Sequence, residues 1–133
     1  MSRENLELVH QAVDAFNRRD LDAFLALCDP NVEAVSRLVE VEGGGSYRGH
    51  RGIRSWWEGL LAISPDLSAE IEEVRDLGDV TVARLCLRGH GAQSDIPMEQ
   101  TQWHVSRWRS KKSTSWRVVL SEAEALEAAG LSE

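Results

Sequence analysis

The sequence predicts an α+β fold in which three N-terminal helices pack on a strongly curved antiparallel sheet and a short helix ends the chain. Apolar residues recur at helical spacing in the first half of the 133-residue chain and again near its end. Strand-like segments fill the second half and are joined by turn signals. A curved sheet over three helices forms a cone-shaped barrel with an open mouth, where ligand pockets tend to form. We expect residues 1–133 to form one such domain.

The first two helices are predicted in residues 3–18 and 21–28, each with its apolar side chains on one face. Ser2 and Asp20 occupy the positions of N-terminal caps. Asp29–Pro30 is expected to stop the second helix, because the residue before a proline avoids the helical region.

The third helix is predicted in residues 51–63, after an extended segment at 31–41 and a loop at Gly43–Gly45. Its apolar residues recur at positions i, i+3, i+4, i+7 and i+8. Both Trp56 and Trp57 therefore lie on or beside the buried stripe of the helix.

Two hairpins are predicted in the second half of the chain. Segments 67–77 and 80–90 flank Gly78–Asp79, a strong turn signal. Segments 97–109 and 115–120 flank a second turn. The four strands together form an antiparallel meander.

A short helix follows these strands. Ser121 and Glu124 have the spacing of a capping box, and Gly130 is suited to the C-terminal cap.

Charge and composition exclude several classes of function. The net charge of −7 disfavours contact with phosphate backbones, so we expect no nucleic-acid partner. Apolar runs are too short for a membrane span, and the polar N-terminus lacks the core of a signal peptide. Cys28 and Cys86 lie in no disulfide or metal-binding pattern, which indicates reduced thiols in the cytoplasm.

The order of these segments resembles the SnoaL-like branch of the nuclear transport factor 2-like superfamily. The resemblance rests on "FNRRDLDAFLALCDPNVE", on the segment from Tyr47–Gly49 to Gly52–Ile53, and on the ending "EALEAAGL". It covers nearly the whole chain and implies a cone-shaped α+β barrel, commonly a homodimer through the outer sheet face. Relatives include isomerases, dehydratases, polyketide cyclases, epoxide hydrolases and ligand-binding domains. Their enzymes usually carry an aspartate, or an aspartate with a histidine, deep in the cone, and this sequence has no clear equivalent.

Alternation along residues 97–109 separates two faces of the predicted strand. We favour as the pocket face the one that gathers hydrogen-bonding side chains, namely Gln100, Gln102 and His104. The opposite face carries Glu99, Thr101 and Trp103. If that face lines the pocket instead, Glu99 becomes its carboxylate.

Candidate catalytic residues each have a structural alternative. His104 can exchange protons near neutral pH, or it is a core histidine in a polar network. Tyr47 can donate a hydrogen bond to a ligand oxygen that becomes negative, or it anchors the loop. Glu40 and Glu42 stand near the predicted mouth, as a base or as solvated side chains.

Trp56 and Trp57 are the candidate ligand-stacking residues, and core packing alone explains at least one of them. We expect no metal and no cofactor, because the sequence has no His or Cys/His ligand pattern and no phosphate-binding glycine motif. A Gly-x-Ser-x-Gly nucleophile elbow is also absent.

The sequence is compatible with three functions. The chain is a cofactor-free isomerase, cyclase or dehydratase that acts on a small, mostly apolar, oxygenated molecule through His104. Alternatively, it binds such a ligand without chemistry, or it is a dimeric interaction domain. A homodimer is expected because Trp103 and Val105 lie on the outer face of the sheet unless a partner covers them.

Overall fold

The computed structural model describes residues 3–36 and 46–130 of the chain. Within these ranges, the predicted helices are present as α1 (Arg3–Asn17), α2 (Leu21–Ala26), α3 (Gly49–Ile63) and α4 (Glu122–Ala128). The second helix ends before the predicted stop, because Asp29 and Pro30 already belong to the strand that follows it.

The predicted caps are confirmed where the structure describes them. The Asp20 carboxylate accepts a hydrogen bond from the backbone N–H of Ala23 at 3.1 Å. The Ser121 hydroxyl accepts one from the N–H of Glu124 at 3.1 Å. Gly130 has a φ of +83°, the left-handed backbone of a helix C-terminal cap. The predicted cap at Ser2 lies outside the described residues.

The sheet has six strands rather than the four predicted. The strands are β1 (Cys28–Ser36), β2 (Ser46–Arg48), β3 (Ser68–Asp76), β4 (Val80–His90), β5 (Pro97–Arg109) and β6 (Lys112–Val119). The first strand corresponds to the predicted extended segment. Residues 37–41 of that segment and the predicted Gly43–Gly45 loop lie outside the described residues.

The strand order is β2-β1-β6-β5-β4-β3, and the pairing of β1 with β6 is parallel. The prediction of a purely antiparallel sheet is therefore wrong at this pair. The hairpins formed by β3, β4, β5 and β6 are antiparallel, as predicted. The predicted strong curl is not present, and β2 and β3 remain as two separate edges. Alternation in a sequence reports the faces of a strand, whereas curvature depends on pairing and on bulges.

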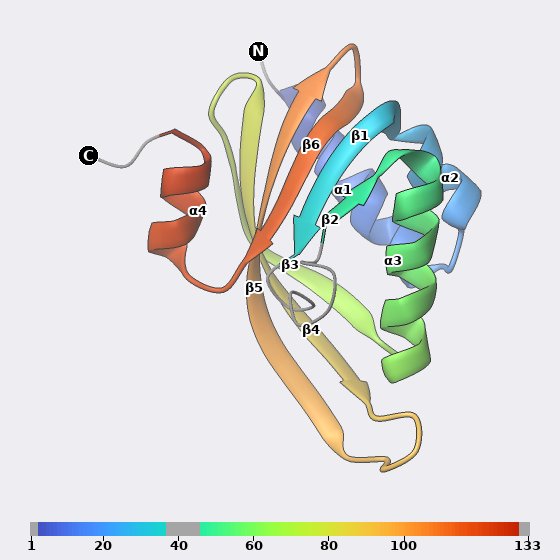
Figure 1. Ribbon diagram of the computed structural model, residues 1–133. Helices are drawn as coiled ribbons and strands as arrows, with labels where there is room; N and C mark the ends of the chain where they lie inside the picture. Colours follow the sequence, from blue (N-terminus) through green and yellow to red (C-terminus); the bar gives the residue numbers. More distant parts are fainter. Residues whose placement is uncertain (1–2, 37–45, 131–133) are drawn as a thin grey trace.

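Helices cover both faces of the sheet (Figure 1). The helices α1, α2 and α3 lie together on one face, here called the inner face, and bury the larger apolar core against it. The last helix, α4, lies apart on the outer face, where Ala125 packs on a smaller cluster that includes Val82 and Val105. Trp103 packs against this cluster and is partly buried. Val105 and Trp103, which we expected to need a partner, are thus covered within the chain.

Neither described range contains a helix with the length and apolar character needed to cross a membrane.

Candidate functional site

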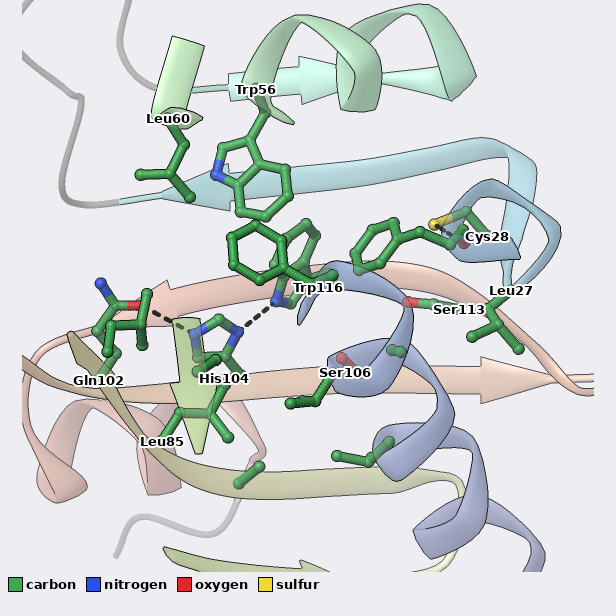
Figure 2. A pocket seen from close by; sticks show the side chains of 18 of the residues that line it. Leu27, Cys28, Trp56, Leu60, Leu85, Gln102, His104, Ser106, Ser113 and Trp116 are labelled. Atoms are coloured by element: carbon green, nitrogen blue, oxygen red, sulfur yellow. Dashed lines mark hydrogen bonds between the residues drawn. The ribbon is translucent and has the colours of Figure 1, made fainter. Parts of the chain in front are cut away.

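A pocket lies between the three N-terminal helices and the inner face of β4, β5 and β6 (Figure 2). Its cavity volume is about 90 Å³. The lining is almost entirely apolar and aromatic, with Val9, Phe16, Phe24, Trp56, Leu85 and Trp116 among its residues. Concave apolar sites with a few polar groups are the usual form of small-molecule pockets.

The polar part of the lining is a hydrogen-bonded chain along the inner face. The indole Nε1–H of Trp116 donates to Nδ1 of His104 at 3.0 Å. Nε2 of His104 lies 2.9 Å from Oε1 of Gln102, and the Gln102 amide donates to Oε1 of Gln100 at 2.9 Å. Figure 2 shows the first two of these bonds on either side of the imidazole ring.

This chain determines the protonation of His104. An indole N–H can only donate, so Nδ1 of His104 must be the unprotonated acceptor. The ring proton then sits on Nε2 and is donated to Gln102. Burial in the apolar lining lowers the pKa of His104 to about 3, because it disfavours the charged imidazolium. The side chain is therefore neutral near pH 7 and uses both ring nitrogens in internal hydrogen bonds.

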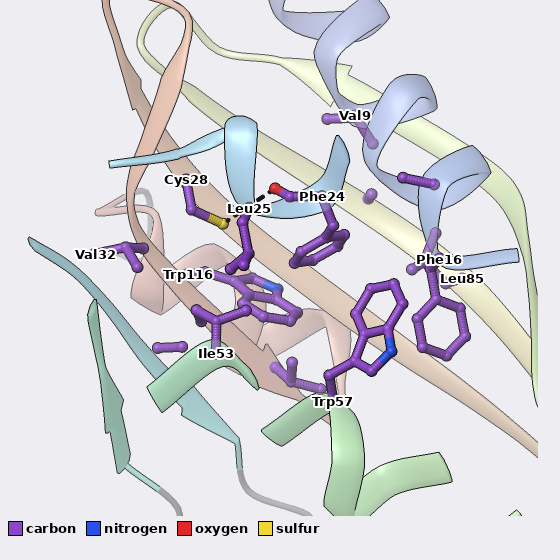
Figure 3. Packing of buried hydrophobic residues seen from close by; sticks show 14 of the residues in the cluster. Val9, Phe16, Phe24, Leu25, Cys28, Val32, Ile53, Trp57, Leu85 and Trp116 are labelled. Atoms are coloured by element: carbon purple, nitrogen blue, oxygen red, sulfur yellow. Dashed lines mark hydrogen bonds between the residues drawn. The ribbon is translucent and has the colours of Figure 1, made fainter. Parts of the chain in front are cut away.

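Trp56 and Trp57 occupy different environments, although they are adjacent on α3. Trp56 is partly exposed and lines the pocket, where its ring meets Trp116 edge-on at 4.6 Å between centroids. Trp57 is 5% exposed and lies outside the lining, packed edge-on against Phe16 and Phe24 (Figure 3). Only Trp56 is thus in a position to contact a ligand.

Of the other predicted site residues that the structure describes, only Gln102 lines the pocket. Gln100 is exposed and reaches the pocket only through its bond to Gln102. Tyr47 lies on β2, outside the pocket lining, and packs against the edge of the larger core. Glu40 and Glu42 lie outside the described residues.

Glu99, the alternative carboxylate, is on the outer face. It accepts hydrogen bonds there from Arg88 at 3.2 Å and from the Cys86 thiol at 3.5 Å. The lining of the pocket contains no Asp, Glu, Lys or Arg among the residues that the structure describes. No cluster of metal-binding side chains occurs within residues 3–36 and 46–130.

A buried thiol, Cys28, also borders the pocket. It lies 3.6 Å from the backbone carbonyl of Phe24. Burial raises the pKa of Cys28 to about 12, so this thiol stays protonated near pH 7 and is a poor nucleophile.

Trp116 is the residue of this site that the sequence did not indicate. It lies on β6 opposite Ser106 of β5. Its indole N–H donates the hydrogen bond that orients the His104 ring. The alternation of Trp116 and Val118 with the exposed Arg117 was a signal for its inward direction.

The chain thus has an α+β fold with an apolar cavity between α1–α3 and the inner face of the sheet. The chain belongs to the family of the SnoaL-like domain, whose sequence profile matches residues 9–118. No functionally curated protein matches it.

Solved structures with the same fold are similar to this chain at low sequence identity. An NTF2-like protein of unknown function from Burkholderia pseudomallei is 21% identical, with a TM-score of 0.81 and coverage of 96% of this chain and 97% of that one. TerC, co-crystallised with polyporic acid, is 20% identical, with a TM-score of 0.79 and coverage of 93% and 96%. IdmH from Streptomyces antibioticus, a proposed polyketide cyclase, is 21% identical, with a TM-score of 0.77 and coverage of 93% and 96%. At these identities the likeness establishes the fold.

Proposed function

We propose that this chain binds a small, mostly apolar, oxygenated molecule in the pocket between α1–α3 and the sheet, without converting it chemically. The observation that carries this proposal is the lining itself, which is apolar and aromatic and contains one neutral hydrogen-bonded chain. The co-crystallisation of TerC with polyporic acid supports a ligand-binding role for proteins of this fold.

Catalysis by His104 is the weaker alternative. An isomerase, cyclase or dehydratase needs a group that gains and loses a proton near the working pH. The pKa of His104 is about 3 because of burial, and its acceptor nitrogen is occupied by Trp116. No carboxylate among the described residues lines the pocket to assist it. IdmH, a proposed polyketide cyclase, shares this fold, but the residues of this pocket favour binding.

The size of the cavity bounds the ligand. A cavity of about 150 Å³ holds one benzene molecule in an engineered protein core. This cavity, at about 90 Å³, admits a single small ring only if neighbouring side chains shift. Trp56 and Leu60 are the obvious candidates, since both line the pocket, are partly exposed and lie on one helix.

Ala83→Leu is expected to abolish binding of toluene, an apolar probe, without unfolding the protein. Ala83 is 2% exposed, lines the pocket and pairs with His104 in the sheet, so a larger side chain fills the cavity. Binding is measured by changes in the indole N–H signals in NMR titrations. The matched control is Ala62→Leu, an exposed position on α3. The proposal is wrong if wild type binds no small aromatic probe, or if Ala83→Leu binds toluene as well as wild type does.

We also propose a homodimer through the part of the outer face that α4 leaves uncovered. Cys86 lies on this part of the face and is 3% exposed. Two ion pairs flank it, one between Arg84 and Glu72 at 3.2 Å and one between Arg88 and Glu70 at 3.1 Å. A second copy presenting the same face can exchange such pairs about a two-fold axis.

Thr101→Arg is expected to convert this dimer to a monomer. Thr101 is exposed and pairs with Cys86, so an added cation lies in the middle of the proposed interface. Glu58→Arg, on the exposed side of α3, is the control with the same new side chain. Sedimentation velocity at micromolar concentration measures the oligomeric state of both variants and of wild type. A wild-type protein that sediments only as a monomer contradicts the dimer.

A further inference from the structure

The hydroxyl group of Ser106 is an unused hydrogen-bonding group inside the pocket. Ser106 lies on β5 beside His104 along the inner face, and it lines the cavity. Its Oγ makes no hydrogen bond with any described residue, whereas the nearest polar side chains of the lining are engaged. His104 and Gln102 belong to the chain described above, and the Ser113 hydroxyl donates to the backbone carbonyl of Ser115 at 3.2 Å.

Other donors in the lining are engaged or lie elsewhere. The Trp108 indole N–H donates to the Thr81 hydroxyl at 2.9 Å. The Trp56 indole nitrogen has no partner among the described residues, but it lies on the Leu60 side of the pocket in Figure 2, away from Ser106. In Figure 2, Ser106 lies between His104 and Ser113, on the sheet side of the pocket, and it is the hydroxyl there without a hydrogen-bond partner among the described residues.

The pocket around Ser106 disfavours charge. Transfer of an ion from water into an apolar site costs several kcal/mol or more unless an opposite charge is present. The described lining offers no charged side chain, because burial keeps His104 neutral near pH 7 and no Asp, Glu, Lys or Arg lines the pocket. An ammonium or carboxylate ligand would lose its hydration here and find no counter-charge in return.

We propose that Ser106 selects the ligand by hydrogen bonding to a hydroxyl or carbonyl oxygen of an uncharged molecule. This inference rests on the proposed binding function and adds the residue and the functional group that give it specificity. A ligand oxygen near Ser106 completes the hydrogen bonding of the serine. A purely apolar ligand covers that hydroxyl and leaves it without a partner, which is unfavourable.

Phenol and toluene are a matched pair of probes for this proposal, because they differ by a hydroxyl against a methyl group. We expect Ser106→Ala to weaken phenol binding by about 3- to 10-fold, the contribution of one neutral hydrogen bond. Toluene binding is expected to stay the same or to strengthen slightly. Both affinities are measured by NMR titration of wild type and variant, so the readout is the change in the phenol-to-toluene ratio.

Ser113→Ala is the matched control, since it removes a hydroxyl of the same pocket whose hydrogen is already donated to the backbone. The ratio of phenol to toluene affinity is expected to change little in Ser113→Ala.

Benzoate and benzylammonium are expected to bind wild type much more weakly than phenol does. An unchanged ratio in Ser106→Ala, or tighter binding of either ion than of phenol, overturns the inference while the binding function stands. Failure of every probe to bind wild type overturns both.

Discussion

Acidification from about pH 6.5 towards pH 3 is expected to destabilise this protein, with His104 responsible for a large part of the loss. The pKa of His104 is about 3 in the folded chain because of burial, against the ordinary value of 6.5. Between these values the unfolded chain binds a proton that the folded chain does not, so the free energy of unfolding falls as the pH falls. At about 1.4 kcal/mol for each pH unit, the whole window amounts to roughly 4–5 kcal/mol.

His104→Gln is expected to flatten this dependence. Glutamine offers an acceptor for Trp116 and a donor for Gln102, but it gains no proton. Urea unfolding of wild type and His104→Gln between about pH 7 and pH 4 gives the free energy of unfolding at each pH. If this free energy falls equally steeply with pH in both proteins above about pH 4.5, where most carboxylates remain ionised, the prediction is wrong.

His90 supplies a control of opposite sign. Its hydrogen bond to Asp66, at 2.7 Å, raises the pKa of His90 above its ordinary value of 6.5. The stabilisation that the His90–Asp66 pair contributes is fully present below about pH 6.5, where His90 is protonated. It is lost as the pH rises through the raised pKa of His90. His90→Gln should therefore remove a small stabilisation at mildly acidic pH, and should leave the loss attributed to His104 in place.

Ile53→Ala is expected to lower the free energy of unfolding by about 2–5 kcal/mol, the usual cost of truncating a buried isoleucine. Ile53 on α3 is fully buried at 0% exposure, in the core between the helices and the inner sheet face. Truncation removes apolar contacts and leaves a cavity that the neighbouring side chains fill only in part.

The same substitution at Ile63, near the end of the same helix, is the control. Ile63 is 52% exposed, so Ile63→Ala should change stability by less than about 0.5 kcal/mol. Urea midpoints and slopes measure both variants. Similar losses at the two positions would mean that the assigned buried face of α3 is wrong.

The site was predictable in part, because strand alternation needs only local information. The period of two along β5 separates the face of Gln102 and His104 from that of Glu99 and Trp103, and the hydrogen-bonding side chains on the first face were the reason to favour it. The role of Trp116 did not follow, because its contact with His104 depends on the register between β5 and β6. The position of Tyr47 did not follow either, for a similar reason. The sequence could not show that β2 pairs with β1 at the edge of the sheet, away from the pocket.

The helices, the caps at Asp20, Ser121 and Gly130, and the hairpins were predictable from the sequence alone, since each depends on side chains a few residues apart. The sequence also indicated the family, through segments spread over most of the chain. The parallel pairing of β1 with β6, the place of α4 on the outer face and the neutral state of His104 became apparent only from the three-dimensional structure. These depend on contacts between distant segments, whose free energies come from burial and register and leave no periodic trace in either segment alone.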